Sequence, residues 1–254
     1  MTVNKKSLPL SRVVYIVPAG LLILAWEALA SWKGSPLFPP FSAVARQFYT
    51  LLVTQGSLWT HITASLFRVT AGFVLGSAAG LLAGVLIGWN RLAAGSLGPL
   101  VSIFYPIPAL GWLPLLMLWV GLNEALPVLI VFICCFFPVL YNTASGIRNV
   151  DARHIRAART LGASELQILR SVVLPLALPS IFTGLKLEAG MAWRVIIAAE
   201  MVAVPTGIGV LMMKAESLIR VDTIMVCLAV LSLMCFSFEK MIRYFEKRFT
   251  CYWR

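Results

Sequence analysis

Long apolar runs limit what this chain can fold into more than any other feature of its sequence. Six stretches are apolar enough, and five of them fully long enough, to cross a hydrocarbon layer about 30 Å thick as a helix. They are Val13–Trp32, Leu66–Trp89, Leu97–Val120, Leu126–Gly146, Ile181–Val204 and the shorter Ile224–Phe238. Of the 254 residues only 12% are charged, whereas soluble domains carry about 25%. We therefore predict an all-α integral membrane protein with about six spanning helices.

Lysine and arginine are distributed unevenly between the segments that flank these runs. With a cytoplasmic N-terminus, fourteen of them fall on the cytoplasmic side: Lys5, Lys6, Arg12, Arg91, Arg148, Arg153, Arg156, Arg159, Arg170, Lys240, Arg243, Lys247, Arg248 and Arg254. Four fall on the other side: Lys33, Arg46, Lys214 and Arg220. Because basic residues beside spans stay in the cytoplasm, we predict cytoplasmic tails at residues 1–12 and 246–254. The membrane domain then covers 13–245, with a cytoplasmic loop at 148–175.

The first run admits two interpretations. Ala28-Leu29-Ala30 resembles a signal-peptidase site, but Trp26 and Glu27 beside it favour an uncleaved anchor. Prolines end this helix shortly afterwards, at positions 36, 39 and 40. Ser42 can then cap a short amphipathic helix, which we expect to lie along the outer interface.

Glycines and prolines distinguish two of the other runs. Five glycines recur at every fourth position of the second run, namely Gly72, Gly76, Gly80, Gly84 and Gly88. This ridge predicts close packing against another helix. The third run contains Pro106, Pro108, Gly111 and Pro114, and Pro138 interrupts the fourth. Broken backbone at membrane depth either lines an aqueous pathway or is a simple kink, so we name Pro108 as a candidate pathway residue.

Ionisable residues inside the apolar runs are costly and are therefore candidates for function or pairing. They are Glu27, Arg68, Glu188, Arg194 and Glu200. Arg68 stands at the start of its run and can snorkel to the interface. Neighbours in the series 188, 194 and 200 are six residues apart, so they point about 120° away from one another and cannot pair well. Arg194 either attracts an anionic substrate or pairs with an acid on another helix.

The loop at 148–175 contains the signals of two short helices. Asp151 can cap the first helix, and Gly162 can end it. Ser164 and Gln167 have the spacing of a capping box for the second. The loop therefore predicts a compact helix pair that projects from the membrane.

This loop resembles the EAA loop of binding-protein-dependent ABC importer permeases. The resemblance rests on Ala157-Ala158, on Gly162 and, after nine intervening residues, on Val172-x-Leu174-Pro175. Arg156 stands where the family has glutamate, which puts the polar contact of that glutamate in doubt here. Segments elsewhere are similar to the nitrate, sulfonate, taurine and bicarbonate branch, namely Ser65-Leu66-x-Arg68, Leu118-Trp119-x-Gly121 and Trp193 followed by Ala198-Ala199-Glu200-Met201.

The resemblance implies a type I ABC importer (MetI-like) transmembrane domain in the inner membrane of a bacterium or archaeon. It implies a homodimer of permease chains, two ABC ATPase subunits that bind ATP and Mg²⁺, and an external solute-binding protein. The chain itself would be no enzyme and would bind no cofactor or metal. Candidate ATPase-coupling residues are Arg153, Arg156, Ala157, Ala158, Arg159, Gly162 and Ala163; candidate substrate-pathway residues are Arg68, Pro108, Trp193, Arg194 and Glu200.

The cargo implied by the resemblance is a small anion, such as a sulfonate, taurine, nitrate or bicarbonate. A pyrimidine- or flavin-type vitamin precursor is the alternative. A secondary transporter without ATPase partners would leave the helix pair unexplained. A membrane enzyme is disfavoured because His61 and His154 lack a His-Glu-x-x-His context. The chain contains no Gly-x-x-x-x-Gly-Lys-Ser/Thr segment for binding ATP, and its basic residues do not form the single face that nucleic acid requires.

Overall fold

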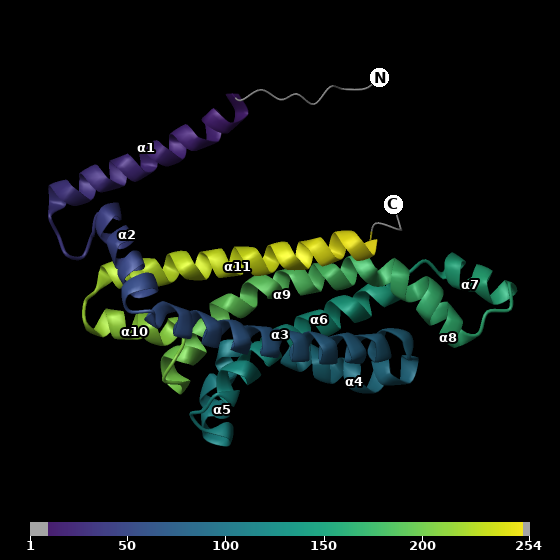
Figure 1. The fold of residues 1–254 in the computed structure, drawn as a ribbon. Coiled ribbons are helices and arrows are strands. Elements are labelled where there is room, and N and C mark those ends of the chain that lie inside the picture. Colours follow the sequence, from purple (N-terminus) through teal and green to yellow (C-terminus); the bar gives the residue numbers. More distant parts are fainter. Residues whose placement is uncertain (1–9, 251–254) are drawn as a thin grey trace.

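A computed structural model describes residues 10–250, and every regular element in that range is helical (Figure 1). The α-helices are α1 (Leu10–Lys33), α2 (Phe41–Tyr49), α3 (Ser57–Trp89), α4 (Arg91–Phe104), α5 (Leu113–Val120), α6 (Ala125–Arg148), α7 (Ala152–Thr160), α8 (Glu165–Ile168), α9 (Leu174–Ala203), α10 (Ile208–Ser217) and α11 (Val221–Thr250). Three short turns join them: η1 (Thr50–Thr54), η2 (Ala109–Trp112) and η3 (Leu169–Val173).

Within residues 10–250, four of the helical segments are long and apolar enough to cross a membrane. They are α3, α6, α11 and the continuous segment Glu165–Ala203 that ends in α9. A fifth span arises if α4 and the η2–α5 segment count as one, because these two are bent by 86° at their break. The multi-span prediction is thus confirmed at four to five spans. The first predicted span coincides with α1, a 24-residue helix outside this set, part of whose side chains lie outside the described residues.

Helix α6 lies between α3 and α9 and forms the centre of the bundle. The glycine ridge of α3 faces it, as predicted. A Cβ atom built on Gly76 would lie 2.5 Å from the carbonyl oxygen of Phe132, and one on Gly80 would lie 2.5 Å from that of Phe136. Side chains larger than hydrogen would therefore force the two backbones apart.

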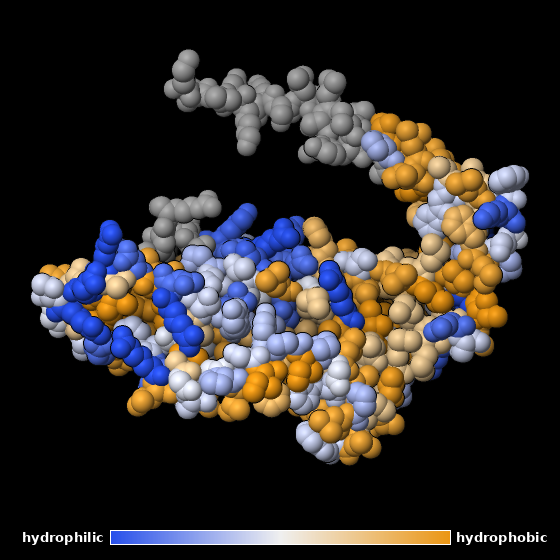
Figure 2. All heavy atoms as spheres, turned by 180° about the vertical axis from the view of Figure 1, so that it is seen from behind, coloured by the Kyte–Doolittle hydropathy of each residue, from blue (hydrophilic) through white to orange (hydrophobic). Residues whose placement is uncertain are grey.

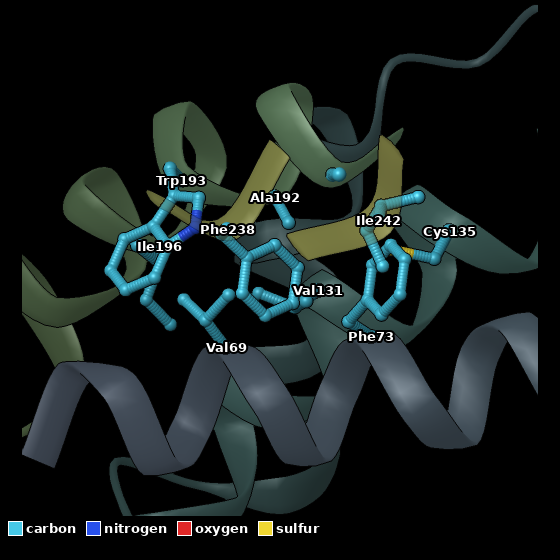
Figure 3. Packing of buried hydrophobic residues seen from close by; sticks show 10 residues of the cluster. Val69, Phe73, Val131, Cys135, Ala192, Trp193, Ile196, Phe238 and Ile242 are labelled. Atoms are coloured by element: carbon cyan, nitrogen blue, oxygen red, sulfur yellow. The ribbon is translucent and has the colours of Figure 1, made fainter. Parts of the chain in front are cut away.

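Aromatic and aliphatic side chains from four helices close the core beside this contact. Val69 and Phe73 of α3, Val131 of α6, Trp193 of α9 and Phe238 of α11 meet there, as Figure 3 shows. The ring of Phe238 packs edge-on against Phe73 and Trp193, with centroids 5.1 and 6.0 Å apart. The four helices thus share one packed interior.

The third predicted span is broken where the sequence places its prolines. Helix α4 ends at Phe104, and α5 begins again at Leu113 with Pro114 in its first turn. Proline lacks an N–H donor and fits best in the first turn of a helix, where that donor would have no partner within the helix. Pro138, in contrast, lies within α6, which continues past it to Arg148.

One predicted cap is wrong. Helix α2 begins at Phe41 after Pro40, so Ser42 lies inside its first turn. The carboxylate of Glu27 instead accepts hydrogen bonds from the backbone N–H of Ser42 (3.1 Å) and from its hydroxyl (2.7 Å). Together with the Trp26–Phe41 ring contact, this carboxylate attaches the end of α1 to α2, while the rest of α1 stands apart from the bundle (Figure 1).

Candidate coupling loop and membrane-embedded charges

The predicted helix pair is present as α7 and α8, which project from one end of the bundle (Figure 1). Asp151 Oδ1 accepts the backbone N–H of Arg153 at 2.8 Å and caps α7. Gly162, at φ +83°, ends it in the left-handed conformation that favours glycine. Ser164 Oγ and Gln167 Oε1 form a complete capping box at the start of α8. Local sequence signals therefore determine the shape of this loop.

The helix pair is anchored to the spanning helices rather than hanging from them. Ile155 and Ala158 of α7 pack against a buried cluster that includes Ile147 of α6, Ile168 of α8 and Val173. Arg159 and Glu165 join the two short helices by an ion pair of 2.8 Å. A force applied to α7 is therefore transmitted to α6 and α9 through packed side chains.

The candidate coupling residues divide between two sides of the helix pair. Ala158 and Ala163 are half-buried and belong to its packed side, whereas Arg153, Arg156, Ala157, Arg159 and Gly162 are exposed. Sequence reasoning missed Leu161, whose surface is 87% exposed at the tip of the loop. Its signal was a leucine directly before Gly162, the residue that ends the helix. In Figure 2, hydrophilic side chains gather at the end that carries α7 and α8.

A buried ion-pair network lies at the opposite end of the bundle, centred on Arg68 of α3. Arg68 is only 2% exposed, so the snorkelling interpretation is wrong. All five of its N–H groups have partners. Two donate to Glu124, which precedes α6, at 2.7 and 2.9 Å. One donates to Glu200 of α9 at 2.8 Å, and two donate to Thr206.

Glu200 extends this network to the start of α10. It is fully buried and accepts hydrogen bonds from the hydroxyl of Ser65 and from the backbone N–H of Gly209 at 3.0 Å. His61 Nδ1 accepts the N–H of Gly207 at 3.0 Å. One arginine thus faces two carboxylates, and the N-terminal N–H groups of α10 offset the second negative charge.

Sequence reasoning did not find the partners of Arg68. His61, Ser65 and Arg68 lie four and three residues apart and so share one face of α3. That spacing could have indicated a polar stripe. Glu124 and Thr206 gave no such signal, since they lie 56 and 138 residues from Arg68.

Arg194 lies in a different environment from the other membrane-embedded charges. It belongs to an exposed stripe along α9, formed by Leu176, Pro179, Thr183, Leu187, Met191 and Arg194. Its guanidinium has no ion pair within the described part of the chain and contacts the sulfur of Met191 at 3.5 Å. Trp193, the neighbouring pathway candidate, points instead into the core and is 1% exposed. As predicted, 188, 194 and 200 do not pair with one another; Glu188 accepts a contact from Cys134 Sγ.

A groove of about 710 Å³ runs beside Arg194 between α9 and α11. Lys186 and Glu246 form an ion pair of 2.7 Å on one side of it, and Arg243 and Glu239 form one of 3.3 Å on the other. Within each of these two pairs the opposite charges neutralise each other. Arg194 is therefore the cation of this groove that remains available to another charge.

Comparison with known proteins identifies the family. Residues 76–250 match the model of the binding-protein-dependent transport system inner membrane component. The chain belongs to this family. It is 37% identical to a putative ABC transporter permease of Methanocaldococcus jannaschii, over 99% of this chain and 94% of that protein. It is 34% identical to the taurine transport system permease TauC of Escherichia coli, over 95% of this chain and 91% of TauC.

A solved structure supports the fold of this permease family. The inward-facing MetNI methionine ABC transporter aligns with a TM-score of 0.56 at 18% identity, over 77% of this chain and 97% of that chain. The fold is thus that of the transmembrane subunits of ABC importers, as the resemblance implied. The chain is a multi-pass permease component of an ABC importer, of the branch that includes taurine permeases.

Proposed function

We propose that this permease works as a homodimer that imports a small anion, driven by two ATPase subunits that grip α7–α8 and supplied by an external binding protein. The helix pair is the observation that carries the proposal. It combines an exposed surface, ending in Leu161, with a packed base on α6 and α9. In this arrangement ATP and Mg²⁺ bind to the ATPase subunits, and both termini lie in the cytoplasm.

The exposed side of α7 has the features of a surface that binds a groove on a partner protein. Leu161 is an 87% exposed leucine at a loop tip, and Ala157 leaves room for close approach. Exposed apolar residues rimmed by arginines are typical of a protein contact. The capping interactions keep this surface rigid before a partner binds, which lowers the entropic cost of binding.

Leu161→Asp is expected to abolish copurification of the ATPase subunit encoded with this chain, because it places a charge in the contact. Leu92→Asp is the matched control, since Leu92 is 83% exposed at the start of α4, outside the helix pair. Both variants should insert and dimerise normally. Recovery of equal amounts of ATPase with both variants, or of none with the unaltered chain, would contradict the proposed docking surface.

Arg194 supports an anionic cargo. A charged side chain facing lipid at mid-membrane costs about 3 kcal/mol or more, and Arg194 has no acidic partner in the described part of its own chain. A water-filled path between two copies removes this cost and leaves the charge available to a passing anion. The relatives named for taurine, aliphatic sulfonates and nitrate all concern small solutes with an anionic group, which in the zwitterion taurine is its sulfonate.

Arg194→Ala is expected to lower uptake of taurine or nitrate at least about tenfold, a loss of about 1.4 kcal/mol, while leaving copurification of the ATPase intact. Arg194→Lys keeps the charge and should restore most of the uptake. The readout is accumulation of labelled anion in proteoliposomes that contain the complete transporter and its binding protein. Unchanged uptake in the alanine variant would rule out the anion-steering role.

A further inference from the structure

An arginine-lined cavity lies beside α7, where the spanning helices α3 and α6 end. It has a volume of about 670 Å³ and lies between the end of α3, the start of α4 and α7. Four arginines line it, Arg91, Arg148, Arg156 and Arg159, together with one acid, Glu165. The ion pair between Arg159 and Glu165 neutralises one of these charges. The cavity is thus left with an excess of three positive charges.

The remaining arginines are not neutralised from within the chain. Arg148 donates to the backbone carbonyl of Ile87 at 3.1 Å, which satisfies a donor but leaves its charge. In the described residues, the guanidiniums of Arg91 and Arg156 have neither an ion pair nor a hydrogen bond. Like charges held together in a cavity repel unless an anion joins them. Arginine pairs especially well with phosphate oxygens, because its N–H groups form two parallel hydrogen bonds.

The cavity lies at the level where lipid headgroups are found. It is formed where the spanning helices α3 and α6 end, at Trp89 and Arg148, and Trp89 also lines it. Tryptophan at the end of a span marks the membrane–water interface. The bound anion is therefore expected in the headgroup layer.

A second cavity continues from the first one between α4 and α6. Its volume is about 360 Å³, and it shares Ile87, Ala94 and Arg148 with the arginine-lined cavity. Gly98, Val101, Leu140 and Ala144 form its apolar wall alongside these two helices, and its polar wall is formed by Ser102, Tyr141, Ser145 and Asn149. A free inorganic anion is small enough to occupy the first cavity alone and would leave the second one empty. A phospholipid has a charged head for the first cavity and an acyl chain for the second.

We propose that an anionic phospholipid, such as phosphatidylglycerol, binds here, with its phosphate held by Arg91, Arg148 and Arg156 and one acyl chain between α4 and α6. Basic pockets between membrane helices on the cytoplasmic side bind such headgroups. The inference goes beyond the proposed transport function and relies on it only for the side of the membrane. The bound lipid joins α7 to the ends of α3 and α6, so it stiffens the base of the coupling loop.

The test is native mass spectrometry of the full chain, purified in detergent and exposed to equal amounts of phosphatidylglycerol and phosphatidylcholine. The unaltered chain should retain phosphatidylglycerol preferentially. The double variant Arg91→Gln/Arg156→Gln should bind it about thirtyfold more weakly, because each arginine near an anionic headgroup contributes about a fivefold factor. Arg153→Gln/Arg170→Gln removes the same number of charges from the loop at 148–175, outside both cavities, and should bind like the unaltered chain.

Three results would overturn the inference. The first is equal retention of the two lipids by the unaltered chain, and the second is equal loss of phosphatidylglycerol from both double variants. The third is complete displacement of the lipid by millimolar inorganic phosphate, which would identify a site for free oxyanions. No ATPase, binding protein or transported anion takes part in this assay. Failure of the proposed transport function would therefore leave the lipid result unaffected, and the reverse also holds.

Discussion

The contact between α3 and α6 should tolerate no side chain larger than that of glycine at its centre, and Gly76→Ala is the sharpest test. The added Cβ would lie 2.5 Å from the carbonyl oxygen of Phe132 and 3.0 Å from its Cα. Ordinary contact begins at 3.4 Å, so the nearest atom is too close by about 0.9 Å. Both atoms belong to the α6 backbone and cannot rotate away, so the helices themselves must separate.

The expected loss of stability in Gly76→Ala follows from the cost of overpacking, which is about 1–3 kcal/mol for an extra carbon atom in a well-packed interior. Replacing glycine by alanine within a helix also stabilises that helix by up to about 1 kcal/mol, because alanine has the higher helix propensity. Gly95→Ala isolates that gain, because a Cβ on Gly95 of α4 meets nothing within 4 Å. Both variants gain this propensity, so they should differ by the overpacking cost of about 1–3 kcal/mol, which should appear as a melting-temperature gap of roughly 2–12 °C.

The assay is thermal unfolding of both variants in the same detergent, followed by tryptophan fluorescence and by loss of the monodisperse peak in size-exclusion chromatography. Gly76→Ala should melt below the unaltered chain, and Gly95→Ala at or above it. Equal melting temperatures for the two variants would refute the argument that backbone contact at the ridge holds α3 to α6.

The remaining predictions concern the ion-pair network and the loop. Arg68→Ala should destabilise the bundle by about 3–5 kcal/mol because it leaves the fully buried Glu200 without its cation. Glu124→Ala should cost less than about 1 kcal/mol because that carboxylate is 65% exposed. Similar melting temperatures for these two variants would contradict this ranking. Ser164→Ala should cost about 0.5–2 kcal/mol locally by removing the capping box, seen as faster amide exchange at Gln167 without a change in the melting temperature of the bundle.

The sequence alone predicted the features that depend on neighbours along the chain. The capping box of Ser164 and Gln167, the cap at Asp151 and the glycine stop at Gly162 each involve residues at most four positions apart. The glycine ridge was equally predictable, because a period of four in a helix keeps small residues on one side. Local periodicity and capping chemistry are sufficient for such features.

Long-range pairing could not be predicted in the same way. The burial of Arg68 depends on Glu124 and Thr206, which lie 56 and 138 residues away along the chain and are brought beside it only by the packing of the helices. Arg68 stands near the start of an apolar run, which suggested that its side chain reaches the solvent. Helix α3, however, begins nine residues before Leu66, at Ser57. Arg68 is therefore inside the helix, and the network around it replaces water as the partner of its charge.

The structure leaves little freedom for motion within the chain's own core. Helices α3 and α6 are joined by backbone contact along the glycine ridge, α3 and α9 by the Arg68–Glu200 ion pair, and α6 and α9 by the cluster beneath α7. Close-packed interiors of this kind deform little and instead move as units. Under the proposed mechanism, a push on α7 would therefore displace α3, α6 and α9 together. The path would then open and close along the exposed stripe of α9 that carries Arg194.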